Sequence, residues 1–211
     1  MTPPPGPLPR PAPAVPHRLG VFGGTFDPPH VGHLVAAVWS RAALALDEVW
    51  FVVANHPWQK VGTREISPPH DRLAMVEALV ADVAGMEASA IELDRGGPSY
   101  TADTLAQLHD EDADRELFVL LGSDAAANVV TWERADEVRC GATMVLVERP
   151  GLAGPPLPDG WTFERVEIPR LDISSTDLRR RLAAGTPVDG LVPAAVSSVI
   201  AARGLYRGPQ V

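Results

Sequence analysis

Gly23-Gly24-Thr25-Phe26-Asp27-Pro28-Pro29-His30-Val31-Gly32-His33 is the stretch of sequence that decides the fold. It follows a short apolar run at 18–22 that predicts a β-strand. Residues 31–46 come next, and their apolar positions recur at helical spacing, as in an amphipathic helix packed on a sheet. Those positions are Val31, Leu34, Val35, Val38 and Ala42. A strand followed by such a helix is the opening of a βαβ unit.

The same alternation continues along the chain and predicts an α/β fold with an open parallel sheet of about five strands. Further strands are expected at 49–54, 90–93, 117–121 and 143–147. Helices are expected after Ser67-Pro68, near 101–109 and near 132–138. A short strand around 164–168, a helix after Ser174 and a helix at 193–203 should close over the sheet edge. We therefore expect a disordered proline-rich arm at 1–17, a single Rossmann-like domain at 18–207 and a tail at 208–211.

Composition excludes several classes of protein. Of the 211 residues, 45% are hydrophobic and 21% charged, which is ordinary for a globular protein. The net charge of −9 argues against a nucleic-acid binder, and no apolar run is long enough for a membrane span. Cys140 is the only cysteine, so no intramolecular disulfide can form and a cytoplasmic location is expected. We expect Cys140 to be a small buried residue rather than a nucleophile.

The glycines and histidines of the first stretch predict a phosphate site. Ligands of open α/β sheets bind beyond the carboxyl ends of the strands, where the strand order reverses. Gly23 and Gly24 allow close approach of a phosphate to the backbone, and the following helix offers its positive dipole end. His30 and His33 can donate hydrogen bonds to phosphate oxygens from the same first turn. A zinc site is the weaker alternative, because no third ligand has suitable spacing.

Residues 23–33 resemble the signature of the nucleotidylyltransferase superfamily, in the form typical of bacterial nicotinate-nucleotide adenylyltransferases. Ile173-Ser174-Ser175-Thr176-Asp177-Leu178-Arg179 is similar to a second signature of that family. From the residues alone, 174–176 open a helix and offer hydroxyls and N–H groups to an anion. The resemblance implies an ATP site made of Gly23, Gly24, Thr25, Phe26, His30, His33, Gly122, Asp124, Ile173, Ser174, Ser175, Thr176 and Arg179.

Three segments between the signatures resemble the mononucleotide site of the family. The segment 55–60 occupies the place where many relatives have Pro-Pro-His followed by Lys or Arg, although it departs from that pattern at Trp58 and Gln59. The segment 96–101 is similar to the one that surrounds the pyridine ring and its carboxylate. Trp132 is similar to a tryptophan that stacks on the pyridine, although a core tryptophan would look identical. The mononucleotide residues implied are Asn55, Lys60, Tyr100, Thr101 and Trp132.

The resemblance implies transfer of the adenylyl group of ATP to nicotinate mononucleotide, with Mg²⁺ bound alongside ATP and no metal held by the protein alone. His30, His33, Lys60 and Arg179 would be the catalytic residues, with Ser175 assisting them. Nicotinamide mononucleotide or phosphopantetheine as the acceptor, a cytidylyltransferase, and a non-catalytic nucleotide sensor remain alternatives. A class I aminoacyl-tRNA synthetase is disfavoured by the short, acidic chain. No nucleic acid or membrane partner is expected, and a homo-oligomer is left open.

Overall fold

The computed structural model describes residues 16–57, 65–151 and 154–207. Its centre is a six-stranded parallel sheet with the order β3-β2-β1-β4-β5-β6. The strand order therefore reverses between β1 and β4, which creates a crevice beyond their carboxyl ends. The strands are β1 (Arg18–Gly24), β2 (Glu48–Val53), β3 (Met86–Ser89), β4 (Glu116–Gly122), β5 (Thr143–Glu148) and β6 (Glu164–Glu167).

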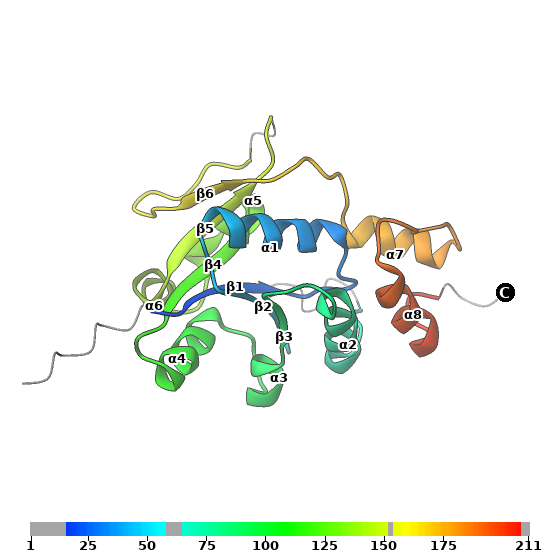
Figure 1. The fold of residues 1–211 in the computed structure, drawn as a ribbon, viewed down its shortest axis with the longest axis horizontal. Coiled ribbons are helices and arrows are strands. Elements are labelled where there is room, and N and C mark those ends of the chain that lie inside the picture. The colour runs from blue at the N-terminus through cyan, green and yellow to red at the C-terminus, as the bar shows by residue number, and fades with distance from the viewer. Residues whose placement is uncertain (1–15, 58–64, 152–153, 208–211) are drawn as a thin grey trace, which may run out of the picture.

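Helices cover both faces of this sheet, and α1 lies on the opposite side from α3 and α4 (Figure 1). One buried cluster joins the sheet to α1, α2, α7 and α8, and the other joins it to α3, α4, α5 and α6. Alternate residues of β4 enter each cluster: Phe118 and Leu120 on one face, and Leu117, Val119 and Leu121 on the other. The helices are α1 (Val31–Ala43), α2 (Pro69–Val80), α3 (Ile91–Arg95), α4 (Thr101–Glu111), α5 (Ser123–Ala127), α6 (Ala135–Gly141), α7 (Ser175–Ala183) and α8 (Ala194–Arg203).

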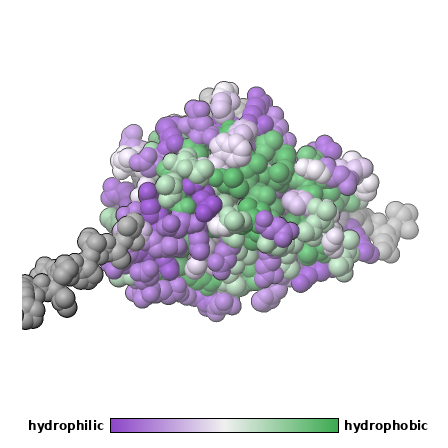
Figure 2. All heavy atoms as spheres, viewed as in Figure 1, coloured by the Kyte–Doolittle hydropathy of each residue, from purple (hydrophilic) through white to green (hydrophobic). Residues whose placement is uncertain are grey.

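Helix α1 contacts the sheet through small side chains. Its buried residues are Ala36, Ala37 and Ser40, so the expected face through Val38 and Ala42 is not the one that is fully covered. Small residues let the helix approach a sheet surface that already carries bulky phenylalanines. On the outer side of this helix, Trp39 is 43% exposed. Apolar side chains accordingly gather on the face of the molecule that carries α1 (Figure 2).

The strand expected at 90–93 is wrong. The strand forms at Met86–Ser89, and residues 91–95 form the short helix α3 instead. The N–H of Ile91 donates to Oγ of Ser89 at 3.4 Å, so this serine supports the start of the helix. A short apolar run does not distinguish a buried strand from a buried helix by periodicity alone.

Other boundaries also differ from expectation. The short strand near 164–168 is the sixth strand of the sheet, paired in parallel with β5. Trp132 precedes α6, which begins only at Ala135. The helix expected after Ser67-Pro68 begins at Pro69, with Pro68 as its N-cap. The expected burial of Cys140 is wrong, because its side chain is exposed near the end of α6.

Within the described residues, no helix has both the length and the apolar character needed to cross a membrane. Residues 1–15 of the expected arm and the whole expected tail at 208–211 lie outside the described residues.

Candidate active site

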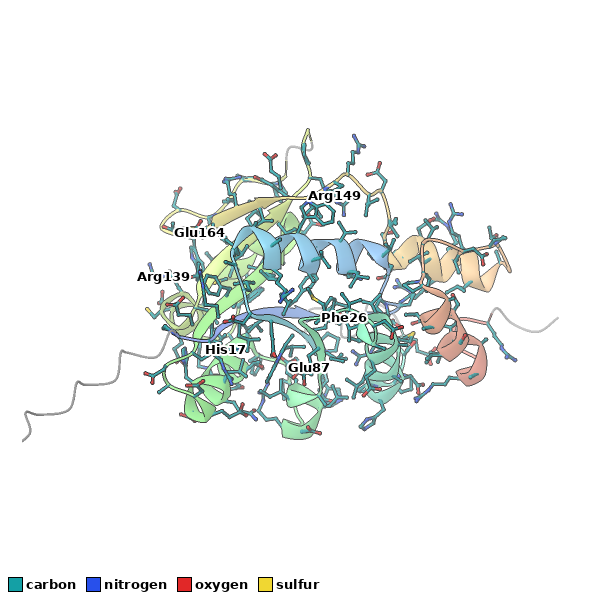
Figure 3. The ribbon with its side chains drawn as sticks, in the orientation of Figure 1. His17, Phe26, Glu87, Arg139, Arg149 and Glu164 are labelled. Atoms are coloured by element: carbon teal, nitrogen blue, oxygen red, sulfur yellow. The ribbon has the colours of Figure 1, made fainter. Side chains whose placement is uncertain are left out.

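Two cavities adjoin at the carboxyl ends of β1 and β4. One has a volume of about 850 Å³ and the other about 720 Å³, sizes that suit a nucleotide each. Gly23, Gly24, Thr25 and Asp124 line both cavities and thus form their common wall. Figure 3 shows two residues of this region, Phe26 and Arg149, at the end of the sheet away from His17 and Glu164. The common wall stands at the predicted switch point of the sheet.

The 720 Å³ cavity, here named the phosphate cavity, contains the residues that the two signatures bring together. Residues from the first signature, from the end of β4 and from the start of α7 all line it. Those predicted from the sequence are Gly23, Gly24, Thr25, Phe26, His30, His33, Gly122, Asp124, Ile173, Ser174, Ser175, Thr176 and Arg179. Every residue predicted for ATP therefore lies on one cavity.

His30 and His33 form a stacked pair at the start of α1. Their ring centroids lie 3.7 Å apart with an interplanar angle of 25°. The backbone N–H of His30 donates to Nδ1 of His33 at 3.2 Å, so a neutral His33 ring carries its proton on Nε2. Gly32 makes this arrangement possible, because a Cβ there would lie 3.0 Å from Nδ1 of His30.

His30 is buried, with 6% of its surface exposed. Burial, with a smaller effect from the positive charge of Arg149, lowers the pKa of His30 to about 4. Its Nδ1 is shielded from solvent and makes no hydrogen bond with the described residues. At neutral pH, His30 is therefore an uncharged ring with a single N–H to donate.

The two glycines at the end of β1 have different roles. A Cβ on Gly23 would meet no atom within 4 Å, so Gly23 borders open space. A Cβ on Gly24 would lie 2.7 Å from Cζ of Phe26, so Gly24 makes room for that ring. Phe26 has a φ of 50° and its ring packs edge-on against His33, with centroids 5.2 Å apart. Phe26 therefore supports the histidines as well as lining the cavity.

Helix α7 begins at the phosphate cavity. Oγ of Ser174 accepts a hydrogen bond from the N–H of Asp177 at 3.2 Å, which confirms the predicted cap. Oγ of Ser175 donates to the carbonyl of Pro28 at 2.9 Å, and Nη1 of Arg179 donates to the carbonyl of Asp27 at 2.7 Å. The second signature thus holds the first signature in place while its helix start faces the cavity.

The loop of the first signature is also held by a residue near the C-terminal end of the described chain. The hydroxyl of Tyr206 donates to Oδ1 of Asp27 at 2.6 Å, and only 2% of Asp27 is exposed. Burial, reinforced by the charge of Asp27, raises the pKa of Tyr206, which keeps the hydroxyl protonated as a donor. Asp27 therefore helps to hold the loop of the first signature in place by accepting the hydrogen bond from Tyr206.

The 850 Å³ cavity, here named the pyridine cavity, is lined by Tyr100, Thr101 and Trp132 as predicted. Trp132 also packs against the buried cluster on that face of the sheet, and its stacking on a pyridine ring stays a prediction. Glu92 adds a buried carboxyl group, whose Oε1 accepts from the hydroxyl of Thr104 at 2.8 Å. Burial raises the pKa of Glu92, and this effect outweighs the lowering effects of hydrogen bonds from Ser99 and Thr104 and of the positive charge of Arg95.

One predicted residue is placed differently, and another lies outside the described residues. Asn55 is absent from the lining of both cavities, and its Nδ2 donates instead to the carbonyl of Gly97 at 2.9 Å. It therefore holds the turn that leads to Tyr100. Lys60 lies outside the described residues.

Arg149 is a site residue that the sequence patterns missed. It follows β5 directly and lines the phosphate cavity. The available signal was its position, since a charged residue just after a buried parallel strand lies at the ligand edge of the sheet. Together with Arg179, it gives the cavity two guanidinium groups.

Fold and site together define a class. A parallel sheet that reverses its order at a pair of nucleotide-sized cavities, with a His-x-Gly-His turn and two arginines at one of them, is the arrangement of a nucleotidylyltransferase. The cytidylyltransferase-like family model matches residues 21–181, and the chain belongs to that family.

Curated relatives indicate a more specific family than the family model does. A protein of Saccharopolyspora erythraea is 47% identical over 194 residues, which cover 90% of each chain. A protein of Streptomyces coelicolor is 46% identical over 189 residues, covering 89% of this chain and 100% of the relative. Both are named "Probable nicotinate-nucleotide adenylyltransferase". The chain belongs to the nicotinate-nucleotide adenylyltransferase family.

Solved structures agree on the fold. The nicotinic acid mononucleotide adenylyltransferase of Plasmodium falciparum, complexed with NaAD, has a TM-score of 0.72 at 17% identity and covers 90% of this chain and 97% of its own. A second structure of that protein, complexed with APC, has a TM-score of 0.69 and covers the same shares.

Proposed function

We propose that this chain transfers the adenylyl group of ATP to nicotinate mononucleotide, giving deamido-NAD and pyrophosphate. The observation that carries the proposal is the common wall between the two cavities. ATP would bind in the phosphate cavity and the pyridine ring in the pyridine cavity, so that the mononucleotide phosphate meets the α-phosphorus of ATP at Gly23, Gly24 and Thr25. The names of the curated relatives support the choice of substrates.

The reaction needs no strong general base. An oxygen of the mononucleotide phosphate, already ionised at neutral pH, forms a bond to the α-phosphorus. The bond from that phosphorus to the bridging oxygen breaks, and pyrophosphate leaves with the electron pair. Catalysis is then positioning and charge stabilisation, for which His30, His33, Arg149 and Arg179 supply donors. Lys60, Ser174, Ser175 and Thr176 are further proposed phosphate contacts.

Mg²⁺ is proposed to arrive with ATP rather than to reside in the protein. The described residues contain no group of three or more His, Cys, Asp or Glu side chains able to hold a metal. Mg²⁺ usually binds substrate phosphates, water and one or two carboxylates. Asp124, on the common wall, is the carboxylate that would face it. When bound, the ion would neutralise charge on the leaving pyrophosphate.

On the pyridine side, Tyr100 and Thr101 begin α4, whose first N–H groups suit a carboxylate. Trp132 offers a ring on which the pyridine can stack. Asn55 would act by holding this turn. The proposed enzyme is cytoplasmic and consists of one domain at 18–207. The proposal holds for a monomer and for a homo-oligomer.

The test supplies Mg-ATP with nicotinate mononucleotide, nicotinamide mononucleotide or phosphopantetheine, and follows pyrophosphate. We expect the highest kcat/KM with nicotinate mononucleotide. ATP binding without pyrophosphate release from any acceptor would indicate a nucleotide sensor instead. His33→Ala should lower kcat by about 10²- to 10³-fold, as expected for loss of a donor to a transition state. Turnover within a few-fold of the parent would refute the role given to His33.

A further inference from the structure

Arg72, on α2, is a buried arginine that lines neither cavity. Only 1% of its surface is exposed. Arginine is almost never fully buried unless its donors are paired, because removing the charge from water is costly. A residue kept in this position at such a cost needs a specific explanation.

The guanidinium group of Arg72 donates to three backbone carbonyls. Nη1 donates to Thr25 at 2.9 Å, Nε to Ser67 at 2.9 Å and Nη2 to Asn55 at 3.1 Å. Thr25 follows β1 and lines both cavities, whereas Asn55 follows β2, the neighbouring strand. The rigid, planar fork of arginine can hold several acceptors at fixed relative positions. One side chain therefore joins the ends of two adjacent strands.

The connection continues from Asn55 to the turn of the pyridine cavity. Nδ2 of Asn55 donates to the carbonyl of Gly97 at 2.9 Å, and the N–H of Ser99 donates to the carbonyl of His56 at 3.2 Å. Ser99 and the residues after it line the pyridine cavity. A chain of hydrogen bonds thus runs from Thr25, which lines both cavities, through Arg72 and Asn55 to the turn at 97–99, here named the pyridine turn.

We propose that Arg72 is a positioning residue. It fixes the distance between the loop at 25–30, here named the phosphate loop, and the pyridine turn, so that both substrates of adenylyl transfer are held in line. The inference rests on the proposed function. In-line attack tolerates little displacement, and a misplacement of about 1 Å can lower a rate by about 10²-fold. Arg72 lines neither cavity and acts through the backbone that it holds.

The test compares Arg72→Met and Arg72→Lys with Arg115→Met. Arg115 is a matched control because its side chain is also largely buried, with 15% exposure, but it lies beside the first residue of β4, at the opposite edge of the sheet. We expect Arg72→Met to lower kcat by about 10- to 100-fold and to raise KM for both ATP and the mononucleotide. Arg72→Lys should recover part of this loss, whereas Arg115→Met should lower only the thermal midpoint.

Chemical rescue separates positioning from a general contribution to stability. In Arg72→Ala, millimolar guanidinium should raise kcat at least threefold, while equal sodium chloride should not. Kinetic constants for Arg72→Met and Arg72→Lys within twofold of the parent, together with no rescue, would overturn the proposal. An effect on the KM of one substrate alone would also overturn it, because the two sites would then not be linked through this side chain.

Calorimetric binding of Mg-ATP and of nicotinate mononucleotide, measured separately, distinguishes this inference from the proposed function. If the parent bound both but produced no pyrophosphate, the proposed function would fail. Weaker binding of both ligands by Arg72→Lys would still support the linkage, and unchanged binding would refute it. The same measurement decides the question if Arg72→Met does not fold.

Discussion

Replacing His30 with glutamine should flatten the dependence of the protein's stability on pH. In the folded protein, burial and the charge of Arg149 hold the pKa of His30 at about 4, whereas the ring has its ordinary pKa of 6.5 when unfolded. Above pH 6.5 the ring is neutral in both states and has no effect on the pH dependence. Below pH 6.5 the unfolded chain takes up a proton that the folded protein refuses, so the folded state loses stability as the pH falls.

The magnitude follows from the size of the shift. Each pH unit between 6.5 and 4 costs the folded state about 1.4 kcal/mol. Between pH 7.5 and pH 5.0 the free energy of unfolding of the parent should therefore fall by about 2 kcal/mol more than that of His30→Gln. Because only 6% of His30 is exposed, solvent screening should reduce this figure little.

Urea unfolding of both proteins at the two pH values measures the difference, and the comparison cancels the titration of all groups common to them. His70→Gln is the control, since His70 is exposed at the start of α2 and its loss should leave the parent's behaviour unchanged. If His30→Gln lost as much stability as the parent between pH 7.5 and 5.0, burial of a neutral His30 would be the wrong description.

Three further substitutions test the support of the phosphate cavity. Tyr206→Phe removes a hydrogen bond to the buried Asp27 and should lower the free energy of unfolding by about 2 kcal/mol. The melting temperature should then fall by about 4 to 8 °C. A melting temperature equal to the parent's would contradict this prediction. Gly32→Ala places a methyl group 3.0 Å from His30 and should raise the KM for ATP roughly three- to tenfold in steady-state assays without changing the KM for the mononucleotide. Arg149→Met should raise the KM for ATP about tenfold. NMR titration should also find the pKa of His30 above its parent value, because a depressing charge is gone. An unchanged pKa would argue against an electrostatic effect of Arg149 on His30.

Much of the site could be predicted because its residues are close together in sequence. His30 and His33 share one helical turn, and the Ser174 cap with Arg179 shares another, so local spacing was enough to place them. That the two signatures meet is confirmed by the hydrogen bonds of Ser175 and Arg179 to the first loop.

The sequence patterns did not reveal residues whose hydrogen-bond partners lie far away in the chain. Arg72 lies at helical spacing from Val76 and Leu79, so it stands on the apolar side of α2. An arginine in that position was a signal of a buried, paired charge, but its acceptors follow β1 and β2 and could not be found without the fold. The partner of Tyr206 is 179 residues away, which no local pattern can reveal.

The fold was predicted best where strands are long and rich in β-branched residues, as at β2 and β5. Strand β3 was misplaced because Met86-Glu87-Ala88-Ser89 has little intrinsic strand preference. It forms because β2 offers an open edge, and the tertiary context outweighs the local sequence.

The bonds that hold the first loop impose an order on its completion. Asp27 and Pro28 leave the ribosome well before their partners. Ser175, Arg179 and Tyr206 are synthesised 147, 152 and 179 residues later. A nascent chain that already contains all six strands still lacks these side chains. The phosphate loop therefore reaches its final form only after residue 206 has been synthesised, and the growing chain cannot have a complete nucleotide site before then.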